Sequence, residues 1–266
     1  MTGASFVLQD TATMLRRNLL HARRYPSLTL LVAAMPVVFY LIFVFVFGST
    51  LGDGLPGAVG GRDGYIAYLT PGILIVTVAS GVSSTAIVIA MDKHEGIVLR
   101  FRTMSIPRAA VLAGHVVNGL LQTMFSILLV IAVALLVGFR STTSPLEIAA
   151  AVGMLAVATF AFTWLGVALG LVSNSVETAS NLPLPLLLLP FFGSGFVPPE
   201  SMPWPISWFA AYQPFTPMIE TVRGLLLGTP IGWSGVIALG WCAVIALGGY
   251  VWSMRLYSRD PIPSGA

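Results

Sequence analysis

Six long apolar runs dominate this sequence, and its charged residues lie between them or at their ends. Of the 266 residues, 56% are hydrophobic and only 9% are charged. A soluble domain of this size needs more charge than this to solvate its surface, so the sequence predicts an integral membrane protein. Because an α-helix satisfies its own backbone hydrogen bonds in lipid, we expect an all-α fold whose helices cross the membrane.

Each run is long enough, or nearly so, to form a transmembrane helix. A helix needs about 20 residues to cross roughly 30 Å of hydrocarbon. We therefore expect a single transmembrane domain over residues 1–266, with a six-span bundle at residues 28–254. The predicted spans are Leu28–Phe47, Tyr65–Ala90, Ala109–Phe139, Glu147–Val172, Asn181–Val197 and Trp233–Met254.

The fifth run differs from the others in being short and rich in proline. It carries Pro183, Pro185 and Pro190. Proline removes a backbone hydrogen bond from a helix and clashes with the preceding turn. We expect this span to be kinked or broken.

Positive charge is divided unevenly between the segments that connect the runs. If the runs cross the membrane alternately, ten of the 13 Lys and Arg residues lie on one side and three on the other. The positive-inside rule then predicts that both termini are cytoplasmic, with residues 255–266 as a tail. The ten are Arg16, Arg17, Arg23, Arg24, Lys93, Arg100, Arg102, Arg108, Arg255 and Arg259, and the three are Arg62, Arg140 and Arg223.

The first 27 residues have the pattern of a cytoplasmic helix that lies along the membrane surface. Between Ser5 and Arg24, apolar or small residues recur every three or four positions. Such a helix buries its apolar face in lipid and keeps its Arg residues at the level of the phosphates. The alternative is a solvated basic tail. The basic residues concerned are Arg16, Arg17, Arg23 and Arg24.

Two connecting segments on the outer side have distinct compositions. Residues 48–64 are rich in glycine and are expected to be irregular. The segment between spans five and six is expected to form short re-entrant or surface helices, because its apolar runs are too short to span. Within it, Pro217–Leu227 reads as an amphipathic helix that ends at Gly228. Aromatic residues typical of a membrane interface precede this helix, namely Trp204, Trp208 and Tyr212.

The sequence contains no motif for ATP, metal or disulfide chemistry. Its only lysine, Lys93, is not part of a GxxxxGK[ST] phosphate loop, so any ATPase is expected in another chain. The three His residues lack ligand spacing, and Cys242 is the only cysteine. We therefore expect no catalytic residue, metal or cofactor in this chain. The net charge of +3 gives no support for nucleic-acid binding.

Polar residues on one face of the third run have two interpretations. His115, Asn118, Gln122 and Ser126 follow helical spacing. They either form hydrogen bonds between helices or line a substrate path. A further alternative is an intramembrane protease that uses Ser84 with His115. The acidic residues lie in loops or at span ends, which argues against a proton relay and indicates that energy enters from another chain.

The fourth run contains the small-residue pattern Gly166-x-x-x-Gly170. Glycines spaced in this way allow two helices to approach closely. The pattern does not distinguish packing within one chain from packing between two subunits.

The segment between the second and third runs, residues 91–108, is unusually polar for this chain. Its eighteen residues include six charges. After Gly96, apolar residues recur at helical spacing among the charges, at Ile97, Phe101 and Met104. A short helix with an apolar edge is suited to dock a soluble partner. The alternative is an ordinary solvated loop.

Two stretches of this sequence carry a resemblance to a known family. The first has Tyr68, Pro71 and Gly72 at the start of span two and an acidic-Gly-x-x-x-Arg loop after it. The second, between spans five and six, has a series of matching residues. In this pattern the chain resembles the membrane subunits of type-2 ABC exporters, especially the daunorubicin-type drug-resistance permeases of actinobacteria. The loop residues are Glu95, Gly96 and Arg100, and the outer residues are Pro198, Met202, Pro203, Pro214, Thr216, Arg223 and Gly228.

The resemblance implies a bacterial plasma-membrane machine of several subunits. Two permease subunits would pair, most simply as a homodimer, and two ABC ATPase subunits that bind ATP and Mg would lie beneath them. The loop and the N-terminal interfacial helix would fit a groove on the ATPase. Closure of the ATPases would then move the spans, with the proline-containing fifth span as the deformable element. The loop residues implied in this coupling are Glu95, Gly96, Arg100, Phe101 and Arg102.

The expected function is ATP-driven export of an amphipathic drug or lipid-like molecule from the cytoplasm or the inner leaflet. Export of a cell-surface glycan or glycolipid by the same machinery is the main alternative. An intramembrane enzyme and a membrane scaffold without transport activity are further alternatives.

Overall fold

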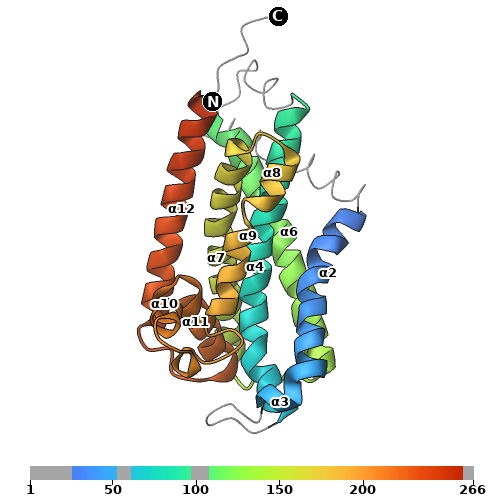
Figure 1. The fold of residues 1–266 in the computed structure, drawn as a ribbon, viewed down its shortest axis with the longest axis vertical. Coiled ribbons are helices and arrows are strands. Elements are labelled where there is room, and N and C mark those ends of the chain that lie inside the picture. The colour runs from blue at the N-terminus through green and yellow to red at the C-terminus, as the bar shows by residue number, and fades with distance from the viewer. Residues whose placement is uncertain (1–25, 53–60, 97–107, 260–266) are drawn as a thin grey trace, which may run out of the picture.

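The computed structural model describes residues 26–52, 61–96 and 108–259 (Figure 1). Within these ranges the chain forms helices joined by short segments and contains no strand. The long helices run side by side along one axis, as expected for an all-α membrane protein. The predicted N-terminal interfacial helix lies outside the described residues, as do its arginines Arg16, Arg17, Arg23 and Arg24.

Among the described residues, five helices are long and apolar enough to cross a membrane, at the positions predicted for spans one to four and six. Their length and mean hydropathy meet the requirements for a membrane span. The first consists of α2, a π-helical turn and α3. The helices are α2 (Pro26–Ile42), η1 (Phe43–Phe47), α3 (Gly48–Gly52), α4 (Arg62–His94), α6 (Arg108–Val137), α7 (Pro145–Val172) and α12 (Ser234–Arg259).

Several predicted boundaries were wrong because helices extend beyond the predicted spans. Helix α4 begins at Arg62 and ends at His94, whereas the predicted span was Tyr65–Ala90. Residues Gly48–Gly52 were expected in a glycine-rich loop, but they extend the first span through α3. The π-helical turn just before them keeps the backbone hydrogen-bonded through this region. At the other end of the chain, α12 passes the predicted boundary at Met254 and ends at Arg259.

The fifth predicted span is broken, as its prolines indicated, but its boundaries differ from the prediction. It runs over Val176–Phe192 rather than Asn181–Val197, and it is shorter than the five long helices. Pro183 separates its first two helices, and Pro190 lies in the final 3₁₀ turn. Its deformability remains a prediction. The pieces are α8 (Val176–Asn181), α9 (Leu184–Leu188) and η2 (Leu189–Phe192).

Short helices follow the broken span, as predicted. The predicted helix Pro217–Leu227 is present as α11 and starts two residues earlier, at Phe215. Gly228 ends it with φ of 71°, a left-handed conformation that favours glycine. Trp204, Trp208 and Tyr212 are exposed, as a membrane interface requires, although their position in a membrane remains a prediction. The helices are η3 (Pro199–Ser201), α10 (Ile206–Tyr212) and α11 (Phe215–Leu227).

Helix α4 forms the centre of the bundle. It contacts α2, α3, α6, α7, α8, α9 and α11, and it is the most buried of the five long helices. Its 33 residues give a length of about 50 Å, which exceeds the thickness of the hydrocarbon layer. The ends of α4 therefore reach both polar faces of the bundle. We refer to them as the Arg62 end and the His94 end.

The glycines Gly166 and Gly170 of α7 pack against α4 of the same chain. A Cβ atom added at Gly166 would lie 2.9 Å from the carbonyl oxygen of Val82. One added at Gly170 would lie 2.7 Å from the carbonyl oxygen of Ala86. The two positions therefore serve close packing within the subunit, which resolves the alternatives that the sequence left open.

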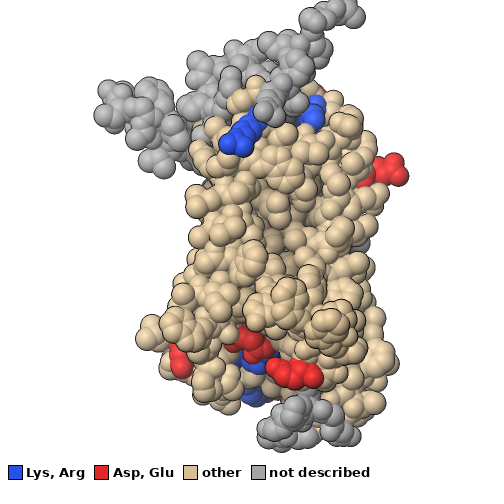
Figure 2. Space-filling model, turned by 60° about the vertical axis from the view of Figure 1, so that its left-hand side comes forward, with Lys and Arg blue, Asp and Glu red and all other residues tan. Residues whose placement is uncertain are grey.

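Charged side chains are concentrated towards the two ends of the described structure. On the face shown in Figure 2, an uncharged belt separates them. Such a belt is what a lipid-facing surface requires. The beginning of α2 and the end of α12 lie at the His94 end (Figure 1), as an even number of crossings would produce. The side of the membrane that this end faces remains a prediction.

The packing of α7 on α4 predicts a position-specific effect of adding one methyl group. Gly170→Ala is expected to destabilise the protein by about 1–3 kcal/mol, because the new Cβ collides with the α4 backbone. Gly153→Ala on the same helix is the control, since a Cβ there meets nothing within 4 Å. Thermal unfolding in detergent measures both. Equal melting temperatures for the two variants would contradict the packing described here.

Candidate functional site

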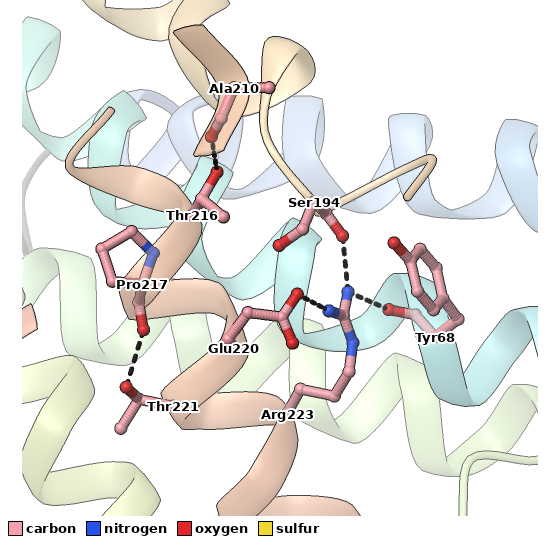
Figure 3. A network of polar contacts seen from close by, with 8 residues as sticks. All are labelled: Tyr68, Ser194, Ala210, Thr216, Pro217, Glu220, Thr221 and Arg223. Atoms are coloured by element: carbon pink, nitrogen blue, oxygen red, sulfur yellow. Dashed lines mark hydrogen bonds and ion pairs between the residues drawn. The ribbon is translucent and has the colours of Figure 1, made fainter. Parts of the chain in front are cut away.

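A buried arginine, Arg223 of α11, links three segments at the Arg62 end (Figure 3). Its Nη2 atom donates to the carbonyl oxygens of Ser194, at 2.6 Å, and Tyr68, at 3.2 Å. Its Nη1 atom is paired with the carboxylate of Glu220. The guanidinium group also lies over the ring of Tyr68, with Cζ 4.0 Å from the ring centroid.

These contacts explain how a guanidinium group that is only 7% exposed can be tolerated in this bundle. Burying a charge is costly unless a countercharge and hydrogen bonds replace water. Glu220 supplies the countercharge, and two backbone carbonyls supply acceptors. Because Ser194 follows the broken span and Tyr68 belongs to α4, Arg223 holds the end of the broken span against α4.

Two glycines bring the same segments into direct backbone contact. A Cβ atom added at Gly72 of α4 would lie 2.5 Å from the carbonyl oxygen of Gly195. No larger residue fits there without moving one of the backbones. The Tyr68–Gly72 stretch therefore meets the segment between spans five and six, so both sequence stretches singled out for their resemblance contribute to one site.

The other predicted residues of the outer segment shape the turn between α10 and α11. Pro214 is the residue before α11, and Gly228 ends that helix. The hydroxyl group of Thr216 donates to the carbonyl oxygen of Ala210 in α10. These three residues place α11 so that Arg223 reaches the broken span.

A second polar cluster lies at the His94 end. Lys93 of α4 donates from Nζ to the carbonyl oxygens of Leu171, at 2.8 Å, and Ser173, at 3.3 Å. The Nε2 atom of His94 lies 3.0 Å from the carbonyl oxygen of Asn174. Carbonyl groups at a helix C-terminus lack intrahelical partners and carry partial negative charge, so a lysine stabilises them. These contacts fasten the end of α4 to the link between α7 and α8.

The predicted ATPase-coupling loop begins directly after this cluster. Glu95 is exposed at the end of α4, and Gly96 follows with φ of 70°, a conformation suited to glycine that turns the chain out of the helix. The rest of the predicted set lies outside the described residues, namely Arg100, Phe101 and Arg102.

The polar face of α6 is used for contacts with α4. The hydroxyl group of Ser84 donates to Oε1 of Gln122 at 3.2 Å. The Nε2 atom of His115 lies 3.5 Å from Oδ2 of Asp92. Ser84 therefore contacts α6 about 10 Å along the helix from His115, which gives no support to the protease hypothesis. Hydrogen bonding between helices accounts for Gln122 and His115. Among the described residues, no group of three or more His, Cys, Asp or Glu residues could hold a metal ion.

Sequence reasoning missed several members of these clusters. Lys93 was considered only as a cation in a loop, although a lone lysine near a predicted helix end is a signal for a contact with carbonyl groups. The Ser194 carbonyl could not be found in this way, because 29 residues separate it from Arg223. Tyr68 is separated from Arg223 by 155 residues.

Comparisons with known proteins identify a matching family and several similar proteins. Residues 9–227 match the sequence model of the ABC-2 type transporter family. A daunorubicin resistance ABC transporter permease protein, DrrB1, from Streptomyces coeruleorubidus is 29% identical over 227 residues, which cover 84% of this chain and 77% of that protein. A probable doxorubicin resistance ABC transporter permease protein, DrrC, from Mycobacterium tuberculosis is 22% identical over 221 residues, which cover 82% and 78%. The matched region includes both polar clusters.

The Arg223 cluster predicts that this arginine is needed for stability. Arg223→Gln should destabilise the protein by about 2 kcal/mol or more, because Glu220 and two carbonyl groups lose a buried donor. The control is Arg140→Gln. Arg140 also donates to backbone carbonyls, but it is exposed, so water can replace it. Thermal unfolding of both variants measures the difference, and similar losses at the two positions would contradict a special role for Arg223.

Proposed function

Because the chain belongs to the ABC-2 type transporter family, we propose that it exports an amphipathic drug or lipid-like molecule, driven by a separate ATPase. The family and the relatives show that it is a permease subunit of a drug-resistance-type ABC transporter, with a transport rather than a catalytic role. The substrate class and the outward direction of transport are what we propose for this chain. The substrate is taken from the cytoplasm or the inner leaflet and released outside.

The character of the described surface supports an amphipathic substrate. The two named relatives are described by resistance to daunorubicin and doxorubicin. In the part of the chain that the structure describes, charged side chains lie towards the two ends of the bundle and leave an uncharged belt between them (Figure 2). The middle parts of the long helices carry no charged residue that could serve as a counterion for a strongly charged substrate, whereas a molecule with a large apolar part does not need one.

The power source is proposed to be a pair of ABC ATPase subunits that bind ATP and Mg. Members of this permease family work with an ABC ATPase. For this chain, we propose two ATPases and a second copy of the permease in the bacterial plasma membrane. The His94 end then faces the cytoplasm, where the loop that follows Glu95 receives the ATPase together with the N-terminal interfacial helix.

The observation that carries this proposal is that α4 holds both ends of the broken span. At the His94 end, Lys93 and His94 fasten α4 to the link that leads into α8. At the Arg62 end, Arg223 fastens the segment after η2 to the Tyr68 carbonyl of α4. A displacement of α4 by the ATPase therefore displaces the broken span as well. Its prolines lower the cost of bending there.

Affinity purification in mild detergent tests the partnership. We expect an ABC ATPase to co-purify with the chain, and we expect Arg100→Glu to lose it, because charge reversal in the loop disrupts the contact. Arg255→Glu, which reverses a charge on α12 at the same end, is the control and should retain the ATPase. Failure to recover any ABC ATPase with the wild type, under several gentle conditions, would count against the proposed function.

Lys93 predicts a separation between ATP hydrolysis and transport. In Lys93→Met the contacts with Leu171 and Ser173 are lost, so the complex should assemble and hydrolyse ATP while its transport rate falls several-fold. Lys93→Arg keeps the charge and the donors and should restore most of the transport. The measurement is transport per ATP hydrolysed in proteoliposomes. An unchanged ratio in Lys93→Met would show that this contact does not transmit motion.

A further inference from the structure

Beside the Arg223 contacts, four buried polar atoms have no hydrogen-bond partner among the described residues. They are the hydroxyl oxygen of Ser194, both polar atoms of the Gln213 amide, and Nε of Arg223. Ser194 is 1% exposed and Gln213 is 4% exposed. More than nine in ten buried polar groups in folded proteins have a partner, so a cluster of exceptions requires an explanation.

Ser194 belongs to a turn of the backbone after the broken span, residues 193–195, and the side chains of Gln213 and Arg223 both reach this turn. A Cβ atom added at Gly193 would lie 2.8 Å from Nε2 of Gln213, so the amide rests on this glycine. The next residue, Ser194, accepts the hydrogen bond from Arg223 through its carbonyl oxygen. Figure 3 shows that Ser194 and Arg223 approach each other from separate segments.

An aromatic surface adjoins the same turn. Phe191 and Phe196 lie on either side of it in sequence, and their rings stack with centroids 4.5 Å apart. Phe196 also contacts Phe43, with ring centroids 4.7 Å apart. Phe43 belongs to the π-helical turn of the first span, a feature that often occurs at functional sites. The turn therefore has unused hydrogen-bonding groups and aromatic rings as near neighbours.

The unused groups are suited to uncharged oxygen-bearing groups. The charge of Arg223 is already balanced by Glu220, so its Nε atom offers a donor rather than a free cation. Ser194 and Gln213 can each donate and accept. A hydroxyl or carbonyl group satisfies them, whereas a phosphate brings negative charge that no unpaired cation here offsets.

We propose that Ser194, Gln213 and Nε of Arg223 form a hydrogen-bonding site for the hydroxyl or carbonyl groups of a substrate, with the nearby phenylalanines contacting its apolar body. This inference rests on the proposed function, because it places the site on the substrate's route near the Arg62 end. It also explains why the Gln213 amide is kept without a partner. Binding groups that serve a ligand are left unsatisfied, at a cost in stability, when the ligand is absent.

Whether a substitution of Gln213 raises or lowers the melting temperature distinguishes a ligand-binding role from a structural one. Gln213→Met keeps a similar volume and removes the two unsatisfied atoms, so the variant should melt at the same temperature or higher. Its affinity for daunorubicin, the drug named for the Streptomyces relative, should fall about tenfold, because hydrogen bonds to the ligand are lost.

The control is Gln122→Met, which removes an amide that accepts a hydrogen bond from Ser84. It should melt lower and bind daunorubicin as the wild type does. The protein is the complex with its ATPase in lipid nanodiscs, and equilibrium dialysis measures drug binding.

Three results have distinct meanings. A lower melting temperature for Gln213→Met would overturn the proposal, because it would show that the amide is structural. A raised melting temperature with unchanged daunorubicin affinity would also overturn it, because the site would lie off the drug's route. If the wild type binds no daunorubicin but the variant melts higher, the drug assignment of the proposed function fails, while a buried site for another oxygen-bearing molecule is supported.

Discussion

The burial of α4 is the constraint on which the rest of this structure depends. A helix longer than the hydrocarbon layer passes through the middle of the bundle and contacts seven other α-helices among the described residues. Close packing of this kind requires glycine on α7, where any Cβ would meet the α4 backbone. Since α4 reaches both polar ends of the bundle, any shift of this helix affects the two ends together.

The broken span also depends on contacts near the two ends of α4. In lipid, a backbone carbonyl or amide without a partner is costly, so an interrupted helix persists only where protein covers it. Lys93 satisfies carbonyl groups where α7 ends, and Arg223 satisfies the carbonyl of Ser194 after η2. These contacts join the segments on either side of the broken span to α4. The two cations therefore lie where backbone carbonyl groups need donors, with Arg223 buried and Lys93 half-buried.

Local chemistry accounts for what could be predicted from the sequence. The runs of apolar residues located the long helices, the prolines indicated the break, and Gly228 marked the end of α11, because each depends on near neighbours. The partners of Arg223 could not be predicted, since Tyr68 and Ser194 come together with it only in three dimensions. The unsatisfied amide of Gln213 had no sequence signal either, because its surroundings come from a distant turn. Arg100, Phe101 and Arg102 lie outside the described residues, so their role in coupling remains a prediction.

The most direct test of the account is ATP-dependent daunorubicin uptake into inside-out vesicles that contain this chain and its ATPase. In such vesicles, the surface that binds ATP faces the added nucleotide, and export appears as uptake. We expect uptake that requires ATP and both proteins and is absent when the chain is omitted. Uptake that is equal with and without the chain, or no ATP-dependent uptake of daunorubicin, would contradict the claim that it is a drug-exporting permease.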